Sequence, residues 1–175
     1  KSINNKIPNS EITIIDTPGL IPDGRISDLI SVENGLKLVP AGEISRKTFK
    51  LEENQVFMFD VFCRFKILGN ELLKSGSKPI FSAYASKSVK FHVARQERVE
   101  ALLNGSFFEI LEGSEKKKYF QNEFVTHEVE IEENEELVIA GLGWINVKRG
   151  PLKIQLEVPE KVKVVIRPSI FRNKK

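Results

Sequence analysis

The amino-acid sequence predicts a β-rich α+β protein in which a mostly antiparallel sheet is joined by one or two helices. Two observations predict this class. Several short segments alternate apolar and polar residues with a period of two, and very few segments show helical spacing. At 175 residues the chain holds one domain, or one domain and part of another, with a core that needs no disulfide or metal.

The composition excludes several classes of protein. Hydrophobic residues make up 41% and charged residues 29%, which is typical of globular proteins and excludes collagen, general disorder and a membrane bundle. No apolar run approaches the ~20 residues of a membrane span, so we expect no membrane partner. The single cysteine, Cys63, excludes an internal disulfide and a multi-cysteine zinc site. No secretory signal is visible, and we therefore expect a cytoplasmic location.

The first elements precede a change of pattern near residue 43. Glu11 to Ile15 is a short apolar strand that ends at an Asp and a Pro-Gly turn. Helical spacing after Asp23 predicts a helix with Asp23 as its N-cap and Gly35 as its end. Pro40 to Ser45 then resembles a linker.

Strands dominate the rest of the chain. The alternation from Val56 to Lys66 predicts one strand with a buried face, and Lys47 to Leu51 is its expected hairpin partner. One clear helix is expected over Gln96 to Asn104. Further strands are expected over residues 79–84, 89–93, 125–131, 137–147, 152–158 and 161–166.

The segment Asp16-Thr17-Pro18-Gly19 follows an apolar strand and gives the sharpest functional signal. P-loop GTPases place such an Asp-x-x-Gly beside the γ-phosphate, where the carboxylate holds Mg²⁺ through a water and the Gly amide contacts the phosphate. A plain turn is the alternative, because Asp and Pro-Gly are common turn residues. The strand before the motif and the helical stretch after it favour the functional interpretation.

Two other GTPase motifs are missing from the sequence. It contains no Gly-x-x-x-x-Gly-Lys-Ser/Thr loop and no Asn-Lys-x-Asp motif, and about 155 residues of different character follow Gly19. A circularly permuted GTPase, whose order places Asp-x-x-Gly last, explains both facts. We therefore expect the last strand and switch II of a P-loop GTPase domain in residues 1–42 and a β-rich C-terminal domain in residues 43–175.

Several stretches resemble the C-terminal part of the circularly permuted ribosome-assembly GTPases of the YqeH type. They are Asp16 to Leu20, Leu36 to Pro40, Glu43-Ile44, Phe49, Phe91-His92, Ala140-Gly141-Leu142-Gly143-Trp144 and Val158 to Val162. The resemblance implies GTP and Mg²⁺ in the full-length protein, and a GTPase that acts in small ribosomal subunit assembly. It implies that Asp16 and Gly19 are catalytic and that Asp16 to Gly19 bind the nucleotide, with Asp16 as the water-mediated Mg²⁺ group. The chain departs from the family at Val93-Ala94, where Arg-Thr is expected.

On this basis we expect the fragment alone to be inactive and to bind no cofactor. Asp16 and Gly19 supply only one edge of a nucleotide site. A severed strand over Glu11 to Ile15 would leave an open edge, through which we expect non-native dimers to form. The competing hypothesis is a free-standing RNA- or protein-binding module without nucleotide chemistry.

Positive charge is concentrated at the end of the chain. Residues 148–175 hold nine Lys and Arg against two Glu, while the whole chain carries a net charge of +3. Such a segment suits a phosphate backbone, so ribosomal RNA or small-subunit proteins are the expected partners. A solvated strand face is the alternative. The candidate RNA-binding residues are Lys148, Arg149, Lys153, Lys161, Lys163 and Arg167.

The remaining conspicuous residues are expected to be structural. Trp144 is predicted to pack in the core with its indole N–H on a carbonyl, and stacking on an RNA base is the alternative. His92 and His127 show no metal-ligand spacing. Cys63 should be an inert core thiol. The acidic run Glu128 to Glu136 is expected to form an exposed hairpin face.

Overall fold

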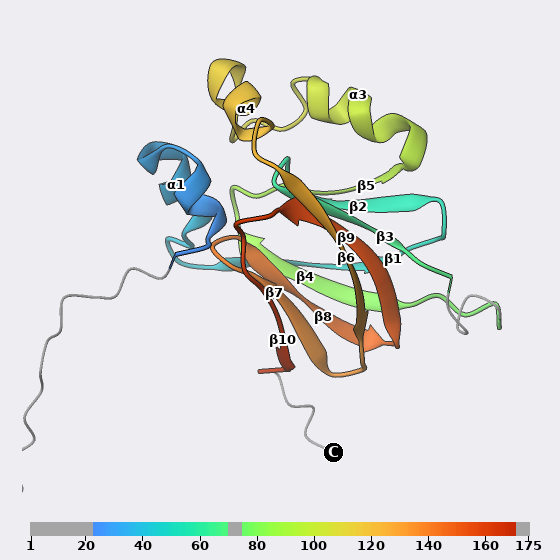
Figure 1. Ribbon diagram of the computed structural model, residues 1–175. Helices are drawn as coiled ribbons and strands as arrows, with labels where there is room; N and C mark the ends of the chain where they lie inside the picture. Colours follow the sequence, from blue (N-terminus) through green and yellow to red (C-terminus); the bar gives the residue numbers. More distant parts are fainter. Residues whose placement is uncertain (1–22, 70–74, 171–175) are drawn as a thin grey trace, which may run out of the picture.

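The computed structural model describes residues 23–69 and 75–170, in which ten strands form two antiparallel sheets (Figure 1). Sheet A contains, in spatial order, β1 (Ile44–Lys50), β4 (Ile80–Ser86), β8 (Gly143–Arg149), β7 (Glu135–Ile139) and β10 (Val164–Pro168). Sheet B contains β5 (Phe91–Arg95), β2 (Gln55–Phe59), β3 (Cys63–Ile67), β9 (Leu152–Pro159) and β6 (Phe124–Ile131). The predicted class, a β-rich domain of mostly antiparallel sheet, is confirmed.

Aromatic side chains fill the space between the two sheets. Phe57 of sheet B lies 5.2 Å from Phe81 and 4.9 Å from Phe49 of sheet A, measured between ring centroids. Phe57 and Phe81 are fully buried. The alternation in the sequence therefore predicts the core correctly, because each of these strands turns one face inward.

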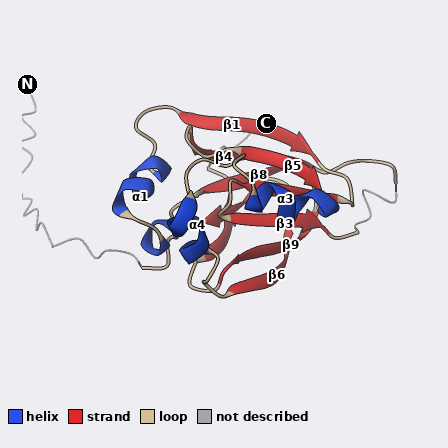
Figure 2. Cartoon of the chain, turned by 90° about the horizontal axis from the view of Figure 1, so that it is seen from above, coloured by secondary structure: helices blue, strands red, loops and turns tan. Residues whose placement is uncertain are grey.

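Helices cover the face of sheet B that points away from sheet A (Figures 1 and 2). The predicted helix is present as η2 (Gln96–Arg98) and α3 (Val99–Asn104). A further helix, α4 (Gly113–Tyr119), lies in a stretch for which the sequence predicts neither a helix nor a strand. The buried Tyr119 hydroxyl donates to the Phe62 carbonyl at 2.7 Å, which fixes α4 to the turn after β2.

The predicted helix from Asp23 to Gly35 is wrong. The chain forms a 3₁₀ turn, η1 (Ile26–Leu29), becomes extended at Ile30, and starts again as α1 (Val32–Leu38). The Ser31 side chain accepts a hydrogen bond from the Asn34 N–H, so Ser31 is the N-cap of α1. Gly35 lies inside α1, where it packs against Ser27.

The predicted strand from Val56 to Lys66 is two strands, β2 and β3, joined by a tight turn at residues 60–62. The alternation continues across the turn because both strands face the same core. The expected hairpin of residues 47–51 with this strand is also wrong, since β1 pairs with β4 in the other sheet. The strand predicted over residues 137–147 is likewise a hairpin of β7 and β8 that turns at Gly141.

Asp60 sits at the β2–β3 turn with a positive φ of 51° and is fully buried. Its carboxylate accepts the N–H groups of Val61 and Lys90 at 3.0 and 3.1 Å. Burial raises the pKa of Asp60 to about 6, against the smaller opposing effect of the two hydrogen bonds.

Cys63 begins β3 with its side chain in the core, as predicted. Burial raises the pKa of its thiol far above the ordinary value, so the thiolate nucleophile is not available at neutral pH.

Candidate functional site

The segment immediately after the Asp-x-x-Gly stretch is hydrogen-bonded to the β7–β8 turn. The Ile26 N–H donates to the Ala140 carbonyl at 2.9 Å, and the Lys163 N–H donates to the Gly24 carbonyl at 2.8 Å. The Ala140 N–H in turn donates to the Lys163 carbonyl at 3.0 Å, and the Ile26 side chain is fully buried. Residues 24–26, which we call the docked segment, are therefore held against the β-domain by backbone hydrogen bonds, although they lie only a few residues beyond Gly19.

Gly141 makes this close approach sterically feasible. It has a φ of +72°, and a Cβ added to it would lie 2.6 Å from the Cβ of Arg25. The next glycine, Gly143, is required for a different reason, because a Cβ there would lie 2.2 Å from the Tyr84 carbonyl oxygen. Gly141 therefore leaves room for Arg25 of the docked segment, and Gly143 leaves room for the Tyr84 backbone of the neighbouring strand.

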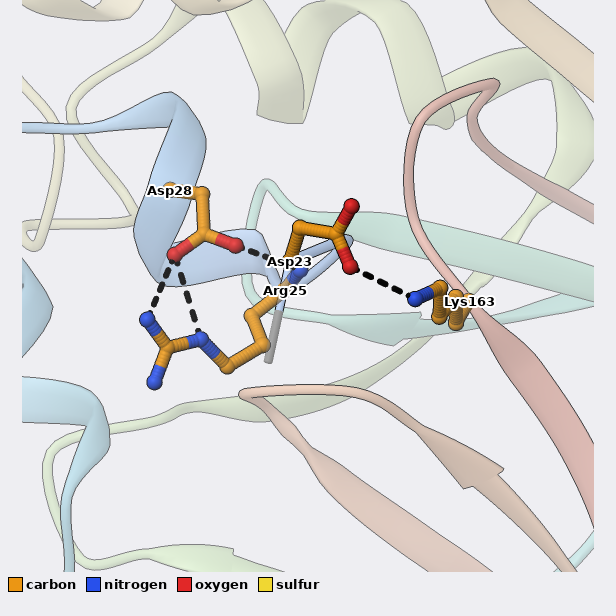
Figure 3. A network of polar contacts seen from close by, with 4 residues as sticks. All are labelled: Asp23, Arg25, Asp28 and Lys163. Atoms are coloured by element: carbon orange, nitrogen blue, oxygen red, sulfur yellow. Dashed lines mark hydrogen bonds and ion pairs between the residues drawn. The ribbon is translucent and has the colours of Figure 1, made fainter. Parts of the chain in front are cut away.

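Polar contacts surround the docked segment (Figure 3). The Arg25 guanidinium donates to Asp28 Oδ1 through Nε and Nη2, at 3.1 and 2.8 Å, and this holds the pKa of Asp28 below its ordinary value. Lys163 Nζ lies 2.8 Å from Asp23 Oδ1, and its hydrogen bond lowers the pKa of that exposed carboxyl. A cavity of about 500 Å³ opens beside these residues and Lys161.

A second contact joins the start of α1 to α4. Glu115 accepts the Ser31 N–H and the Asn34 side-chain amide, each at 2.6 Å. The hydrogen bond from the Ser31 backbone lowers the pKa of Glu115, which therefore remains charged at the N-terminus of α1. Val32 and Leu36 of α1, and Val39 directly after it, are 82%, 67% and 60% exposed.

The residues predicted to bind nucleotide and Mg²⁺, namely Asp16, Thr17, Pro18 and Gly19, lie outside the described residues. The expected strand edge from Glu11 to Ile15 lies outside them as well. Within residues 23–69 and 75–170, no cluster of three or more His, Cys, Asp or Glu could hold a metal ion. His92 instead packs on the Phe107 ring, with the ring centroids 4.6 Å apart.

The six cations predicted to bind RNA are spread over several surfaces. Lys148 and Arg167 lie on the outer face of sheet A, and Arg149 ends β8. Lys153 is on sheet B, directly opposite Glu130 of β6. Lys161 and Lys163 lie at the β9–β10 turn beside Asp23.

Arg167 is an internal ion-pair partner. Its Nη2 lies 3.1 Å from Oε2 of Glu136, a carboxylate that is fully buried. Glu136 Oε1 also accepts the Ser169 hydroxyl at 3.0 Å and the Ile170 N–H at 3.2 Å. The prediction of an exposed acidic face is therefore wrong for Glu136, because the segment after β10 closes over it.

Trp144 does not lie in the core as predicted. The fully buried Ile145 beside it faces inward, so Trp144 faces outward from sheet A, where it is half-buried. Its ring stacks on Tyr84 of the neighbouring strand, with centroids 4.9 Å apart and planes 4° from parallel. The buried Nε1 has no hydrogen-bond partner among the described residues, which contradicts the expected bond to a carbonyl.

Tyr84 is 5% exposed and lies between Arg46 and Trp144 of the neighbouring strands, and neither Tyr84 nor Arg46 stands out in the sequence. The Arg46 guanidinium lies over the Tyr84 ring at 5.7 Å from its centroid, from the strand on the other side. The alternation of β1 indicates that Arg46 and Phe49 lie on opposite faces of that strand. It does not indicate that Arg46 pairs with Tyr84, because the two residues are 38 positions apart in the sequence.

Among the described residues, no helix has the length and hydrophobicity needed to cross a membrane.

Comparison with known proteins identifies the family. The family model "YqeH-like, C-terminal" matches residues 78–170. The chain is also 27% identical over 162 residues to the "Uncharacterized protein YqeH" of Bacillus subtilis (strain 168). That alignment covers 91% of this chain and 42% of the relative, so the chain spans about two fifths of the relative's length. The chain therefore belongs to the YqeH-like family and corresponds to the C-terminal part of a YqeH-type protein.

Proposed function

We propose that this chain is the C-terminal part of a circularly permuted GTPase that acts in small ribosomal subunit assembly. In the complete polypeptide, Asp16 holds Mg²⁺ through a water and the Gly19 amide contacts the γ-phosphate of GTP. The β-domain binds ribosomal RNA or a small-subunit protein and responds to the nucleotide state. Membership of the YqeH-like family and the sequence Asp16 to Gly19 support this proposal.

The observation that carries the coupling is the docking of residues 24–26 on the β7–β8 turn. Switch segments of GTPases move when the γ-phosphate is lost. Here the chain runs from Gly19 to Gly24 in five residues, and Gly24 and Ile26 are hydrogen-bonded to Lys163 and Ala140. We infer that a displacement at Gly19 reaches these two loops of the β-domain through the backbone contacts of Gly24 and Ile26.

The exposed side of α1 supports the same proposal. Val32, Leu36 and Val39 recur at helical spacing and form an apolar stripe that the described residues leave exposed. The relative that this chain matches is more than twice as long, so a nucleotide-binding domain has room in the complete polypeptide. We assign that domain as the occupant of the α1 stripe.

The 175-residue chain alone is expected neither to bind nor to hydrolyse GTP. Its sequence contains no Gly-x-x-x-x-Gly-Lys-Ser/Thr loop, so the backbone amides that cradle the α- and β-phosphates are missing. Calorimetric titration with GTP and Mg²⁺ should therefore give no binding heat, and a measurable affinity would overturn this part of the proposal.

The catalytic assignment is tested in the complete polypeptide. Asp16→Ala should abolish Mg²⁺-dependent GTP hydrolysis, because the metal loses its protein carboxylate. The matched control is Asp23→Ala, which removes a carboxylate seven residues further on that is 93% exposed and should leave hydrolysis unchanged. Unchanged turnover in Asp16→Ala would refute the assignment, and would favour the alternative of a binding module without nucleotide chemistry.

A further inference from the structure

We propose that the end of the β7–β10 ladder is a two-state element, in which the docked segment occupies the place of one hydrogen bond between the strands. When the segment leaves, Lys163 and Ala140 bind each other and the ladder gains that bond. The inference rests on the coupling of the nucleotide state to the β-domain in the proposed function, and it adds what the β-domain does when the segment moves.

The register of the two strands places Lys163 directly opposite Ala140. β7 and β10 pair antiparallel with Val164 opposite Ile139, so the next pair beyond the strand ends is Lys163 with Ala140. The Ala140 N–H donates to the Lys163 carbonyl at 3.0 Å, which is one of the two bonds that such an opposed pair exchanges. In a regular ladder the Lys163 N–H would donate to the Ala140 carbonyl in return.

The docked segment takes both groups of this missing bond. The Lys163 N–H donates to the Gly24 carbonyl at 2.8 Å instead, and the Ala140 carbonyl accepts the Ile26 N–H at 2.9 Å. The segment is thus inserted at one position of the ladder, through an acceptor and a donor two residues apart. Its departure leaves a donor and an acceptor of the β-domain on directly opposed residues.

Backbone hydrogen bonds are therefore satisfied in both states. An unpaired backbone group that is buried is costly, so most such groups in folded proteins have a partner. In the undocked state the Lys163 N–H binds the Ala140 carbonyl, and the released groups of Gly24 and Ile26 bind water. Neither state leaves a buried backbone group of these four residues without a partner, which is what a two-state element requires.

Two side-chain contacts set the balance between the states. The Ile26 side chain is fully buried, and its burial favours the docked state. Asp23 and Lys163 are 93% and 63% exposed, so the ion pair between them contributes little (Figure 3). A movement of switch II therefore has to expose mainly one apolar side chain, and the differential binding of the nucleotide to the two states must supply that free energy.

The change of partner moves the β9–β10 turn. Lys163 directly precedes β10, and pairing with Ala140 draws its backbone toward the β7–β8 turn. The exposed cations Lys161 and Lys163 line the cavity of about 500 Å³ together with Asp23 and the docked segment. The position of these cations thus depends on whether the segment is docked, and so on the nucleotide state.

The test identifies the acceptor of the Lys163 N–H by NMR, through the scalar coupling between a donor nitrogen and the carbonyl carbon of its acceptor. Amide exchange alone does not identify it, because the last pair of a ladder frays and the Lys163 amide exchanges faster in the undocked state as well. In the wild-type 175-residue chain we expect couplings from Lys163 to Gly24 and from Ile26 to Ala140.

Gly141→Asn displaces the segment with little change to the turn itself. Asn tolerates the φ of +72°, whereas its Cβ would lie 2.6 Å from the Arg25 Cβ. We expect both wild-type couplings to disappear and a coupling from Lys163 to Ala140 to replace them. Gly113→Asn is the matched control, because Gly113 has a φ of +52° with no atom within 4 Å of an added Cβ, and it should keep the wild-type couplings.

Ile26→Asn is a second way to displace the segment, because it removes the buried apolar side chain, and circular dichroism should show that each variant is folded. If Lys163 loses its Gly24 coupling in a folded variant and gains none to Ala140, the ladder does not close and the inference is wrong. If both variants keep the wild-type couplings, or unfold, the docked state is the single folded state and the inference is equally wrong.

The same couplings in the complete polypeptide separate this inference from the proposed function. We expect the Lys163 coupling to Ala140 in one of the two nucleotide states, GDP or a non-hydrolysable GTP analogue, and the coupling to Gly24 in the other. An unchanged Gly24 coupling in both states would overturn the coupling to nucleotide and the regulatory role of the ladder end. The GTPase assignment would be unaffected by that result, since Asp16→Ala tests it separately.

Discussion

Gly141 and Arg25 lie in van der Waals contact, and a Cβ on Gly141 would come within 2.6 Å of the Arg25 Cβ. Gly141 also has a φ of +72°, which residues with a side chain rarely adopt. The β7–β8 turn therefore has two independent requirements for glycine, one from its own backbone and one from the docked segment.

The first prediction separates these two requirements. Gly141→Ala should lower the free energy of unfolding by about 2–3 kcal/mol, because it adds the clash with Arg25 to the backbone strain. Urea unfolding measures the effect. The control is Gly76→Ala, at a φ of +75° with no atom within 4 Å of the added Cβ, and it should cost only about 1 kcal/mol. Equal losses in the two variants would mean that the Arg25 contact contributes nothing.

The second prediction concerns the buried carboxylate of Glu136. Glu136→Gln should lower the free energy of unfolding by about 2 kcal/mol, because charged hydrogen bonds from Arg167 and the 169–170 segment become neutral or unfavourable. Glu128→Gln, on the exposed side of β6, changes the same functional group without a buried partner and should have little effect. A stable Glu136→Gln protein would show that the segment after β10 is not held by this carboxylate.

The third prediction concerns pH. The pKa of Asp60 is about 6 in the folded protein and about 3.9 when unfolded, so the folded state holds this proton more tightly. Below about pH 4 this difference adds up to about 3 kcal/mol to the free energy of unfolding. The contribution is lost as the pH rises to about 6.

Asp60→Asn removes this titration and also tolerates the positive φ at this turn. The difference in free energy of unfolding between wild type and variant, measured by urea at each pH, should therefore fall between pH 4 and 6. Asp28→Asn is the opposite control, because the pKa of Asp28 is lowered and its contribution appears as the pH rises. A difference for Asp60→Asn that stays flat from pH 4 to 7 would exclude the buried-carboxylate account.

The sequence predicts the strands and the core well because each strand has one inward face. It misses the turns at Asp60 and Gly141 for the same reason. The odd-numbered positions are apolar on both sides of each turn, so the pattern of two strands resembles that of one long strand. Gly141 is a local turn signal, but a glycine within an apolar run is equally typical of a bulge or a close approach of the backbone.

Other features depend on contacts that local patterns do not contain. Trp144 faces outward because Ile145 faces inward, which strict alternation would have indicated, but the size and apolar neighbours of Trp144 favoured the core. Glu136 is buried by residues more than 30 positions later. The helix α4 carries three lysines and shows no apolar periodicity in the sequence, since Tyr119 is its one fully buried side chain.

The central claim is that the nucleotide state reaches the β-domain through residues 24–26, and amide hydrogen exchange in the complete polypeptide tests it most directly. The Ile26 and Lys163 N–H groups bridge the two parts, whereas the Phe57 amide lies in the core of sheet B and serves as the internal reference. Exchange at Ile26 and Lys163 should differ at least about tenfold between the GDP state and a non-hydrolysable GTP analogue, with Phe57 unchanged. Identical exchange at all three amides in both nucleotide states would contradict the claim.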